Sequence, residues 1–434
     1  MAEANGREQA TKVAAVPLQL TRRNIRSLYL DMGWQGAITA GIGTFLSVFL
    51  VRLGASPFEV GLLTSVPALV TIVLSILLAP LVEGRRDLVR VVTWTRVGSR
   101  ACFLLIALVP LILAGERLAL APAAIVALWG LSAVFSSATT PAFTAVLAEV
   151  VPPRRRPAVN GNRWALFSFV TAVTVALFGR LLDALPFPRN FQFVFALSSL
   201  AGLVSLYYFD RIRLAAAPPT AAWPTRVGPR RYFAGLAHGT VRQPAFASYL
   251  LTTFVYRLGL SLPAALVPIY WVDHVKASNT WIGLTTTAIY GTLVLTYFLW
   301  GRAASRYGHR RVLLISSAGL SFYPLLTTLV REPVWLIPVA IVYGTFVAGI
   351  DISFFEGLLE ASPPEQRASF ANLAVLIGPL CGTAVAGWLG IQAGFITAGA
   401  LSLLGAALFY LLSVGRQRPL QSALADPPER SRPT

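Results

Sequence analysis

Long apolar runs are the feature that most constrains this chain. About twelve segments of roughly 20 residues consist mainly of apolar side chains, and charged residues gather in the short stretches between them. A helix of that length crosses the hydrocarbon core of a bilayer. The expected spans are residues 28–51, 58–82, 92–114, 119–148, 163–183, 190–210, 246–271, 280–303, 312–330, 335–360, 370–391 and 394–414. We therefore predict an all-α polytopic membrane protein with twelve transmembrane helices.

Composition excludes a soluble globular protein. Of the 434 residues, 56% are hydrophobic and 12% are charged, and the mean hydropathy is +0.66. The formal net charge of +18 does not indicate nucleic-acid binding, because apolar runs separate the basic clusters and leave no continuous basic face. The two cysteines, Cys102 and Cys381, lie in separate apolar runs. We expect neither a disulfide framework nor a metal site.

The basic residues predict how the chain is oriented in the membrane. Most of the 36 lysines and arginines fall in the termini and in the stretches before odd-numbered spans, and we assign Arg96, Arg100 and Arg163 to this cytoplasmic set. The longest break between apolar runs is rich in proline and arginine. We predict a cytoplasmic N-terminal tail (1–27), a six-helix bundle (28–210), a cytoplasmic linker (211–245), a second six-helix bundle (246–414) and a cytoplasmic C-terminal tail (415–434).

The two predicted bundles repeat one another in sequence. A shift of 222 residues places Ala55, Ser56, Gly61, Leu62 and Thr64 on Ala277, Ser278, Gly283, Leu284 and Thr286. A shift of 211 residues places Glu149, Pro152, Pro153 and Arg156 on Glu360, Pro363, Pro364 and Arg367. Two separate stretches that repeat in the same order indicate a duplicated six-helix unit. We therefore expect two pseudo-symmetric halves.

A basic turn lies between the eighth and ninth spans. Residues 301–313 read GRAASRYGHRRVL, in which Gly301 would let two helices approach closely and Gly308 would permit the turn. This stretch resembles the loop signature of the major facilitator superfamily, although Ser305 stands where that family has an acid. The first half keeps an acid, Glu83, at the equivalent position. The resemblance implies a secondary transporter in which two halves rock about a central site.

Charged residues near the cytoplasmic ends of the spans are expected to form a gate. Ion pairs between them would hold the inner side shut while the outer side is open. The predicted gate residues are Glu83, Arg85, Glu149, Arg156, Gly301, Arg302, Arg306, Gly308, Arg310, Glu356, Glu360 and Arg367.

The resemblance also implies that the first, fourth, seventh and tenth spans line a central cavity. Polar residues at i, i+4 spacing share one helix face. This rule selects Asp31, Gln35 and Thr39, then Ser132, Ser136 and Thr140, then Thr253, Arg257 and Ser261, with Tyr343 and Asp351 in the tenth span. Trp34 and Tyr256 occupy equivalent repeat positions and are the expected cavity aromatics. Helix packing and hydrogen bonds to a helix's own carbonyl groups are the alternative explanation for the hydroxyl residues.

Ionisable residues inside a span need a partner or a cavity. Arg257 lies near the middle of the seventh span, and Asp351 lies about 6 Å from the corresponding level of the tenth. Arg257 would bind an anionic group of a substrate, or alternatively form a permanent ion pair with Asp351. Asp31 lies nearer the cytoplasmic end of its span and is either a proton-handling group or an interfacial carboxylate.

Enzymatic activity is not expected. His238, His274 and His309 lie in loops or at span ends, and no phosphate-binding loop appears. We predict a monomeric, proton-coupled secondary transporter in the inner cell membrane, with a small and anionic substrate and no cofactor. The alternatives are a drug or lysolipid exporter of the same fold or, in another class, a membrane sensor or scaffold that does not transport.

Overall fold

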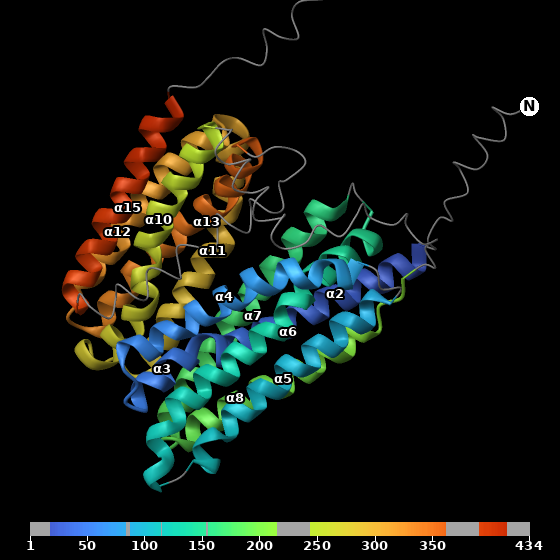
Figure 1. Ribbon diagram of the computed structural model, residues 1–434, viewed down its shortest axis with the longest axis vertical. Helices are drawn as coiled ribbons and strands as arrows, with labels where there is room; N and C mark the ends of the chain where they lie inside the picture. Colours follow the sequence, from blue (N-terminus) through green and yellow to red (C-terminus); the bar gives the residue numbers. More distant parts are fainter. Residues whose placement is uncertain are drawn as a thin grey trace, which may run out of the picture.

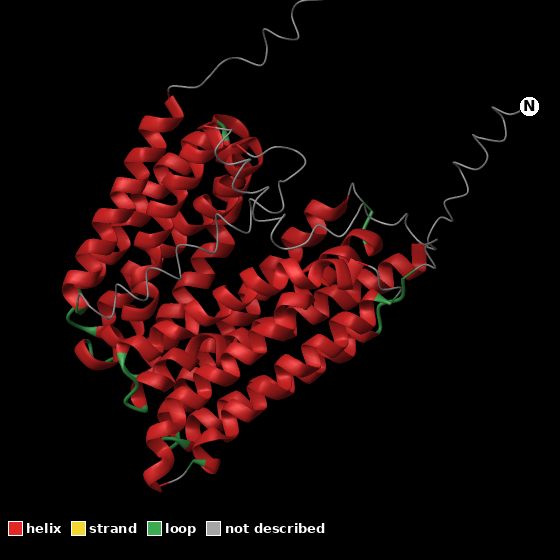
Figure 2. Ribbon diagram, in the orientation of Figure 1, coloured by secondary structure: helices red, strands yellow, loops and turns green. Residues whose placement is uncertain are grey.

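The computed structural model describes residues 18–83, 87–113, 115–152, 155–214, 244–361 and 390–414, and this part of the chain contains helices but no strand (Figure 2). The elements are α2 (Leu18–Ile38), η1 (Thr39–Gly43), α3 (Thr44–Arg52), α4 (Pro57–Glu83), α5 (Leu88–Ile112), η2 (Gly115–Leu120), α6 (Ala121–Val150), α7 (Arg156–Ala184), α8 (Arg189–Asp210), α10 (Pro244–Ile269), η4 (Tyr270–His274), α11 (Asn279–Tyr307), α12 (His309–Leu329), η5 (Pro333–Trp335), α13 (Leu336–Ala361) and α15 (Ile391–Val414). The predicted all-α fold is confirmed.

The helices follow the apolar runs. Within the described ranges, ten helices are long and apolar enough to cross a membrane, and Pro57–Thr71 forms a shorter apolar helix within α4. The predicted eleventh span, 370–391, lies almost entirely outside the described residues, as does most of the linker. Helix α2 begins at Leu18, ten residues before the predicted first span. A π-helical turn interrupts the first span at η1 and follows the seventh at η4.

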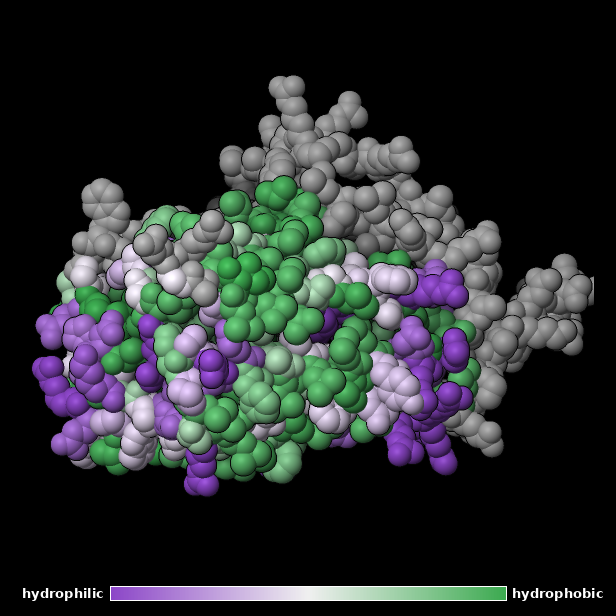
Figure 3. All heavy atoms as spheres, turned by 90° about the horizontal axis from the view of Figure 1, so that it is seen from below, coloured by the Kyte–Doolittle hydropathy of each residue, from purple (hydrophilic) through white to green (hydrophobic). Residues whose placement is uncertain are grey.

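The surface has the polarity that a membrane protein requires. In Figure 3 a broad apolar band separates two groups of hydrophilic side chains at opposite ends of the molecule. Large apolar side chains such as Phe169, Leu177, Leu295 and Phe298 are more than half exposed. Lipid tails, which form no hydrogen bonds, are the environment in which these side chains are stable.

The same helix pairs pack together in both halves. In the first half α4 and α5 pack on α6, while α8 contacts both α2 and α5. In the second half α11 and α12 pack on α13, while α15 contacts both α10 and α12. These sets are equivalent under the sequence repeat. The predicted pseudo-symmetry of the two halves is therefore present in the described packing.

The two halves meet at one end and diverge at the other. In Figure 1 the bundles converge where α3 lies and separate toward the beginning of α2 and the end of α15. Helices α7 and α11 form the main described contact between the halves, with smaller contacts from α10 to α3 and α4. A Cβ atom at Gly179 would lie 2.6 Å from the Asn279 carbonyl oxygen, and one at Gly283 would lie 2.7 Å from the Val175 carbonyl oxygen. Glycine at these two positions lets the backbones touch.

The basic stretch after α11 forms a tight turn. Gly308 has a φ of 84°, which confirms that it permits the turn between α11 and α12. The role expected for Gly301 is not supported, because no described atom lies within 4 Å of a Cβ built there. The hydroxyl of Ser305, which stands in place of the family's acid, donates to the Gly301 carbonyl oxygen at 3.0 Å.

Close contact between α7 and α11 predicts a position-specific effect of added side chains. Gly283→Val should lower the free energy of unfolding by about 1–3 kcal/mol, because the new side chain would overlap the backbone of α7. Gly291→Ala is the matched control, since Gly291 lies in α11 but no described atom lies within 4 Å of its Cβ position. It should leave stability unchanged or raise it by up to about 1 kcal/mol. Thermal unfolding of the detergent-purified variants tests this, and equal effects of the two substitutions would contradict the assigned contact.

Candidate functional site

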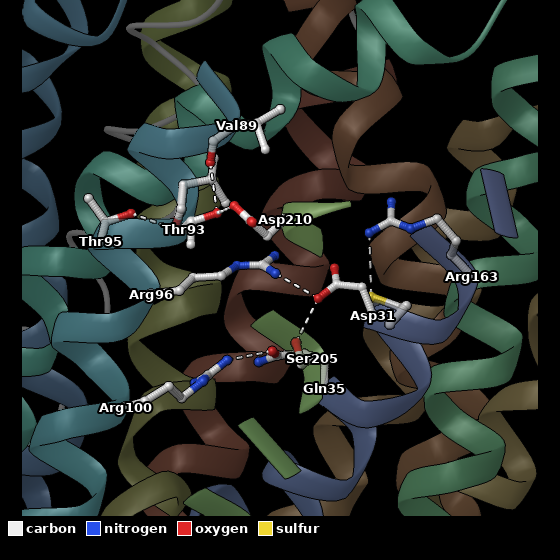
Figure 4. Close-up of polar contacts among 12 residues, drawn as sticks. Asp31, Gln35, Val89, Thr93, Thr95, Arg96, Arg100, Arg163, Ser205 and Asp210 are labelled. Atoms are coloured by element: carbon white, nitrogen blue, oxygen red, sulfur yellow. Dashed lines mark hydrogen bonds and ion pairs between the residues drawn. The ribbon is translucent and has the colours of Figure 1, made fainter. Parts of the chain in front are cut away.

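A buried carboxylate forms the centre of the first half. Asp31 on α2 is 1% exposed, and its Oδ1 lies 2.7 Å from Nη1 of Arg96 on α5. Ser205 on α8 donates to the same oxygen at 2.6 Å (Figure 4). The alternative that Asp31 is an interfacial carboxylate is therefore wrong. Three helices of one bundle enclose its side chain.

Two arginines are buried in the same bundle. Arg163 on α7 is 3% exposed and lies 4.7 Å from the centroid of the Phe143 ring. Arg100 on α5 is 7% exposed, and its Nη2 donates to Gln35 Oε1 on α2 at 2.7 Å (Figure 4). The Nε atoms of both arginines are buried and have no hydrogen-bond partner among the described residues.

The assignment of Arg96, Arg100 and Arg163 to the cytoplasmic loops was wrong. The positive-inside rule treats an arginine at the end of a span as a loop charge. The sequence nevertheless contains a usable signal, because Arg96 and Arg100 are four residues apart within an apolar run and therefore share a helix face. That face of α5 points toward Asp31 and Gln35 on α2.

Positive charge exceeds negative charge inside this bundle. The Asp31 carboxylate is paired with Arg96, whose guanidinium also lies 4.6 Å from the centroid of the Phe209 ring. In the described chain, Arg100 and Arg163 have aromatic and neutral partners but no carboxylate within ion-pair distance. Aromatic rings offset part of the cost of burying a cation, but they do not neutralise its charge. The bundle interior is therefore electropositive.

A pocket of about 240 Å³ opens beside these arginines. Its walls come from α2 with η1, from α5 and from α6, and they are lined by Gln35, Ile38, Thr39, Ile42, Gly43, Arg96, Ser99, Arg100, Phe103, Trp129, Ser136, Thr139 and Thr140. Four predicted cavity residues of the first half, Gln35, Thr39, Ser136 and Thr140, meet here. Guanidinium groups, hydroxyls and two aromatic rings give the pocket both charged and apolar surfaces.

The remaining first-half predictions have different positions. Ser132 is buried and donates to the Trp129 carbonyl oxygen at 2.7 Å, and Ser136 donates to the Ser132 carbonyl oxygen at 3.0 Å. Both hydroxyls thus bond to their own helix, which is the alternative considered for them, although their oxygens can still accept hydrogen bonds. Trp34 is 39% exposed and does not line the pocket.

The second half holds its charges differently from the prediction. Asp351 accepts a hydrogen bond from the Tyr297 hydroxyl at 2.8 Å, and Arg257 lies 4.5 Å from the centroid of the Phe354 ring. The direct ion pair between Arg257 and Asp351, which was the alternative considered for Arg257, does not form among the described contacts. Tyr297 is therefore the described hydrogen-bond partner of Asp351, and the Phe354 ring is the described partner of Arg257.

Helix packing accounts for the other second-half residues. Tyr256 is 1% exposed, and its hydroxyl donates to the Ser317 carbonyl oxygen at 3.2 Å, which places it in the core and corrects its prediction as a cavity aromatic. Tyr343 packs on Tyr323 with ring centroids 4.7 Å apart. The Ser261 hydroxyl donates to the Leu258 carbonyl oxygen on its own helix at 2.8 Å.

The predicted gate is described only in part. Glu149, Arg302 and Arg306 are exposed, and Arg310 is half-buried. Arg156 donates through Nε to the Val151 carbonyl oxygen at 2.9 Å. Arg85 and Arg367 lie outside the described residues, as do the side chains of Glu83, Glu356 and Glu360 on their described helices. The gate ion pairs therefore stay a prediction. Among the described residues, no group of three or more His, Cys, Asp or Glu side chains is placed to hold a metal ion.

Comparison with known proteins places this architecture in a family. The model of the Major Facilitator Superfamily matches residues 32–245 and 249–433. A Multi-drug resistance efflux pump PmrA homolog from Lactococcus lactis is 24% identical over 420 residues, covering 91% of this chain and 93% of that protein. The Staphyloferrin B transporter of Staphylococcus aureus is 27% identical over 154 residues, covering 33% of this chain and 37% of that protein.

Solved transporter structures have the same fold. A POT family transporter in complex with a thioalcohol conjugated peptide superposes with a TM-score of 0.70 at 12% identity, covering 90% of this chain and 96% of that one. The xylose transporter XylE from E. coli, in a partially occluded inward open conformation, gives 0.63 at 11% identity over 90% and 97% of the two chains. At these identities the likeness concerns the fold.

Burial of the Asp31 pair predicts a large effect of removing its charge. Asp31→Asn should lower the free energy of unfolding by about 3–5 kcal/mol, because Arg96 would then be buried without a carboxylate. Asp87→Asn is the matched control: it also removes an aspartate paired with an arginine, but Asp87 and Arg90 have side-chain exposures of 52% and 79%. Its effect should stay below about 1 kcal/mol. Melting temperatures of the two variants check this. Similar shifts would contradict the buried position of Asp31.

Proposed function

The chain belongs to the Major Facilitator Superfamily, and we propose that this secondary transporter carries a small anionic substrate together with protons. The observation that carries the proposal is the position of Arg100. Its guanidinium lines the pocket, is held by neutral Gln35, and has no carboxylate partner in the described chain. A carboxylate or phosphate entering the pocket would supply the missing negative charge.

Electrostatics favours an anion over a neutral or cationic substrate. Arg100 and Arg163 are 7% and 3% exposed, so solvent screens their field only weakly. One Nη atom of Arg100 donates a hydrogen bond to Gln35, while the Nε atom of Arg100 makes no hydrogen bond to a described residue. Gln35 would therefore fix the orientation of the guanidinium, and the remaining N–H groups would bind the substrate's oxygens.

Asp31 is the group that we assign to proton coupling. Arg96 lines the same pocket as Arg100 and is also the ion-pair partner of Asp31. A substrate anion close to Arg96 would compete with Asp31 for this guanidinium. This competition would couple the anion to Asp31, and we propose that a proton and the anion bind together. Ser205 would keep the neutral carboxyl group hydrogen-bonded.

The second half would complete the site by the rocking motion. Arg257 lies on α10, the repeat equivalent of α2, and occupies the position that corresponds to Gln35 under the shift of 222 residues. We propose that Arg257 meets the substrate from the opposite wall and that Tyr297 keeps Asp351 from neutralising it. The substrate would then contact both halves and shift the equilibrium between their two arrangements.

The charge pattern supports an inward-open conformation. The basic turn between α11 and α12 lies at the open end of the molecule, and the positive-inside rule assigns that end to the cytoplasm. We propose that both termini are cytoplasmic, that the halves comprise residues 28–210 and 246–414, and that the protein is a monomer of the inner cell membrane.

An exporter of amphipathic compounds is the second candidate. The similarity to a multidrug resistance efflux pump over 91% of this chain favours it, and Trp129 and Phe103 offer apolar surface within the pocket. A lysolipid would combine both candidates, since it joins a phosphate to an acyl chain. A scaffold that does not transport is disfavoured, because buried arginines cost free energy that such a protein has no reason to spend.

Substitution of Arg100 distinguishes these functions. We expect a thermal-shift screen of carboxylates, phosphate esters, neutral sugars and cationic drugs to find stabilisation by an anionic compound. Arg100→Gln should weaken its binding roughly tenfold or more, because the charged hydrogen bonds are lost. Arg90→Gln, at an exposed arginine of the same helix, should leave binding unchanged. Stabilisation only by cationic or neutral compounds, or equal binding by Arg100→Gln, would contradict the proposal.

A further inference from the structure

The two helices that follow the repeated Ala-Ser sequence begin in different ways. In the first half, Ser56 and Glu59 cap α4 reciprocally: the Ser56 backbone N–H donates to Glu59 Oε2 at 2.8 Å, and the Glu59 N–H donates to Ser56 Oγ at 3.3 Å. This is a capping box within one helix. In the second half, Ser278 is the N-cap of α11 and accepts from the Trp281 N–H at 3.4 Å. Trp281 stands where the repeat places Glu59, so α11 lacks its own capping carboxylate.

A residue of the other half supplies that carboxylate. Asp183, in the last turn of α7, accepts hydrogen bonds from the backbone N–H groups of Asn279 at 2.9 Å and Thr280 at 2.8 Å. It also accepts from the Asn279 side-chain amide at 2.9 Å. The first N–H groups of a helix have no partner within it, and the helix dipole favours a negative charge there. Asp183 therefore completes the cap of α11 across the boundary between the two halves.

A second side chain of the first half contacts the same turn. Arg52, at the end of α3, donates through Nη2 to the Ala277 carbonyl oxygen at 3.4 Å. Asp183 thus accepts hydrogen bonds from backbone N–H groups of this turn, and Arg52 donates one to a backbone carbonyl group of it. Both side chains belong to the first half. Gly179 and Gly283 bring α7 and α11 close enough for these contacts to form.

We propose that Asp183 is a conformational latch, in which the cap of α11 is complete only while the halves are together at this end. Rocking to the alternative conformation would separate α7 from α11, break the three hydrogen bonds and leave the first turn of α11 uncapped. Asp183 thereby shifts the equilibrium toward the conformation seen here. The inference rests on alternating access and is independent of which substrate is carried.

The exposure of Asp183 fits a latch that opens. Because its side chain is exposed, water can replace the lost hydrogen bonds when the halves separate. The carboxylate therefore favours the conformation in which the halves are together at this end, but still allows them to separate. Glu59 provides the internal comparison, since it caps the equivalent helix from within the same helix and has no hydrogen bond or ion pair across the boundary among the described residues.

Distance measurements between the two halves test the latch. Pro186 and Glu332 are exposed and lie in loops of the first and second halves at the closed end. Spin labels on cysteines at these positions, in a full-length chain with Cys102 and Cys381 replaced by serine, would report separation by pulsed electron resonance. Asp183→Ala should raise the ratio of separated to closed molecules roughly fivefold, the effect expected from one helix cap.

Glu59→Ala is the control for the loss of a helix cap alone. It should lower the melting temperature but leave the distance distribution unchanged. If Asp183→Ala does not fold, Asp183→Asn and Arg52→Gln should each shift the distribution in the same direction by a smaller amount. An unchanged distribution in the Asp183 variants, or an equal shift in Glu59→Ala, would overturn the latch and make Asp183 a local helix cap.

Discussion

The burial of more arginines than carboxylates in the first half is the constraint on which the rest of this structure depends. An ionised group inside a bilayer protein costs free energy unless it has a partner. Of Arg96, Arg100 and Arg163, only Arg96 pairs with Asp31 in the described chain. Phe143, Phe103 and the neutral amide of Gln35 surround the other two. Close packing of α2, α5, α7 and α8 is what holds these charges in place.

The two halves contribute different groups to the proposed transport. The first half contains the electropositive pocket, while the second contributes Arg257, which an aromatic ring and not a carboxylate accompanies at close range. Their contact at α7 and α11 depends on glycines that bring backbones together and on the cap that Asp183 provides. In our proposal, charge determines what the protein binds, and backbone hydrogen bonds determine which end is closed.

Hydropathy predicted the helices, and the internal repeat predicted the two halves, because both depend on patterns that every span must satisfy. The i, i+4 rule correctly brought Gln35 and Thr39 to one pocket. It failed for Tyr256 because spacing gives a helix face but does not say which neighbour covers it. Arg100 was missed because counting charges by loop does not distinguish an arginine that points into the bundle from one that points to the lipid headgroups. Height in the membrane suggested Asp351 as an alternative partner of Arg257, whereas Tyr297 donates a hydrogen bond to Asp351.

The central claim is that a guanidinium in the first half binds an anionic group of the substrate. Calorimetric titration of the purified protein with the most stabilising carboxylate, and with the methyl ester of the same compound, tests this most directly. The ester keeps the shape but lacks the charge, so we expect it to bind roughly tenfold more weakly or not at all. Equal affinities of the acid and the ester would contradict the account.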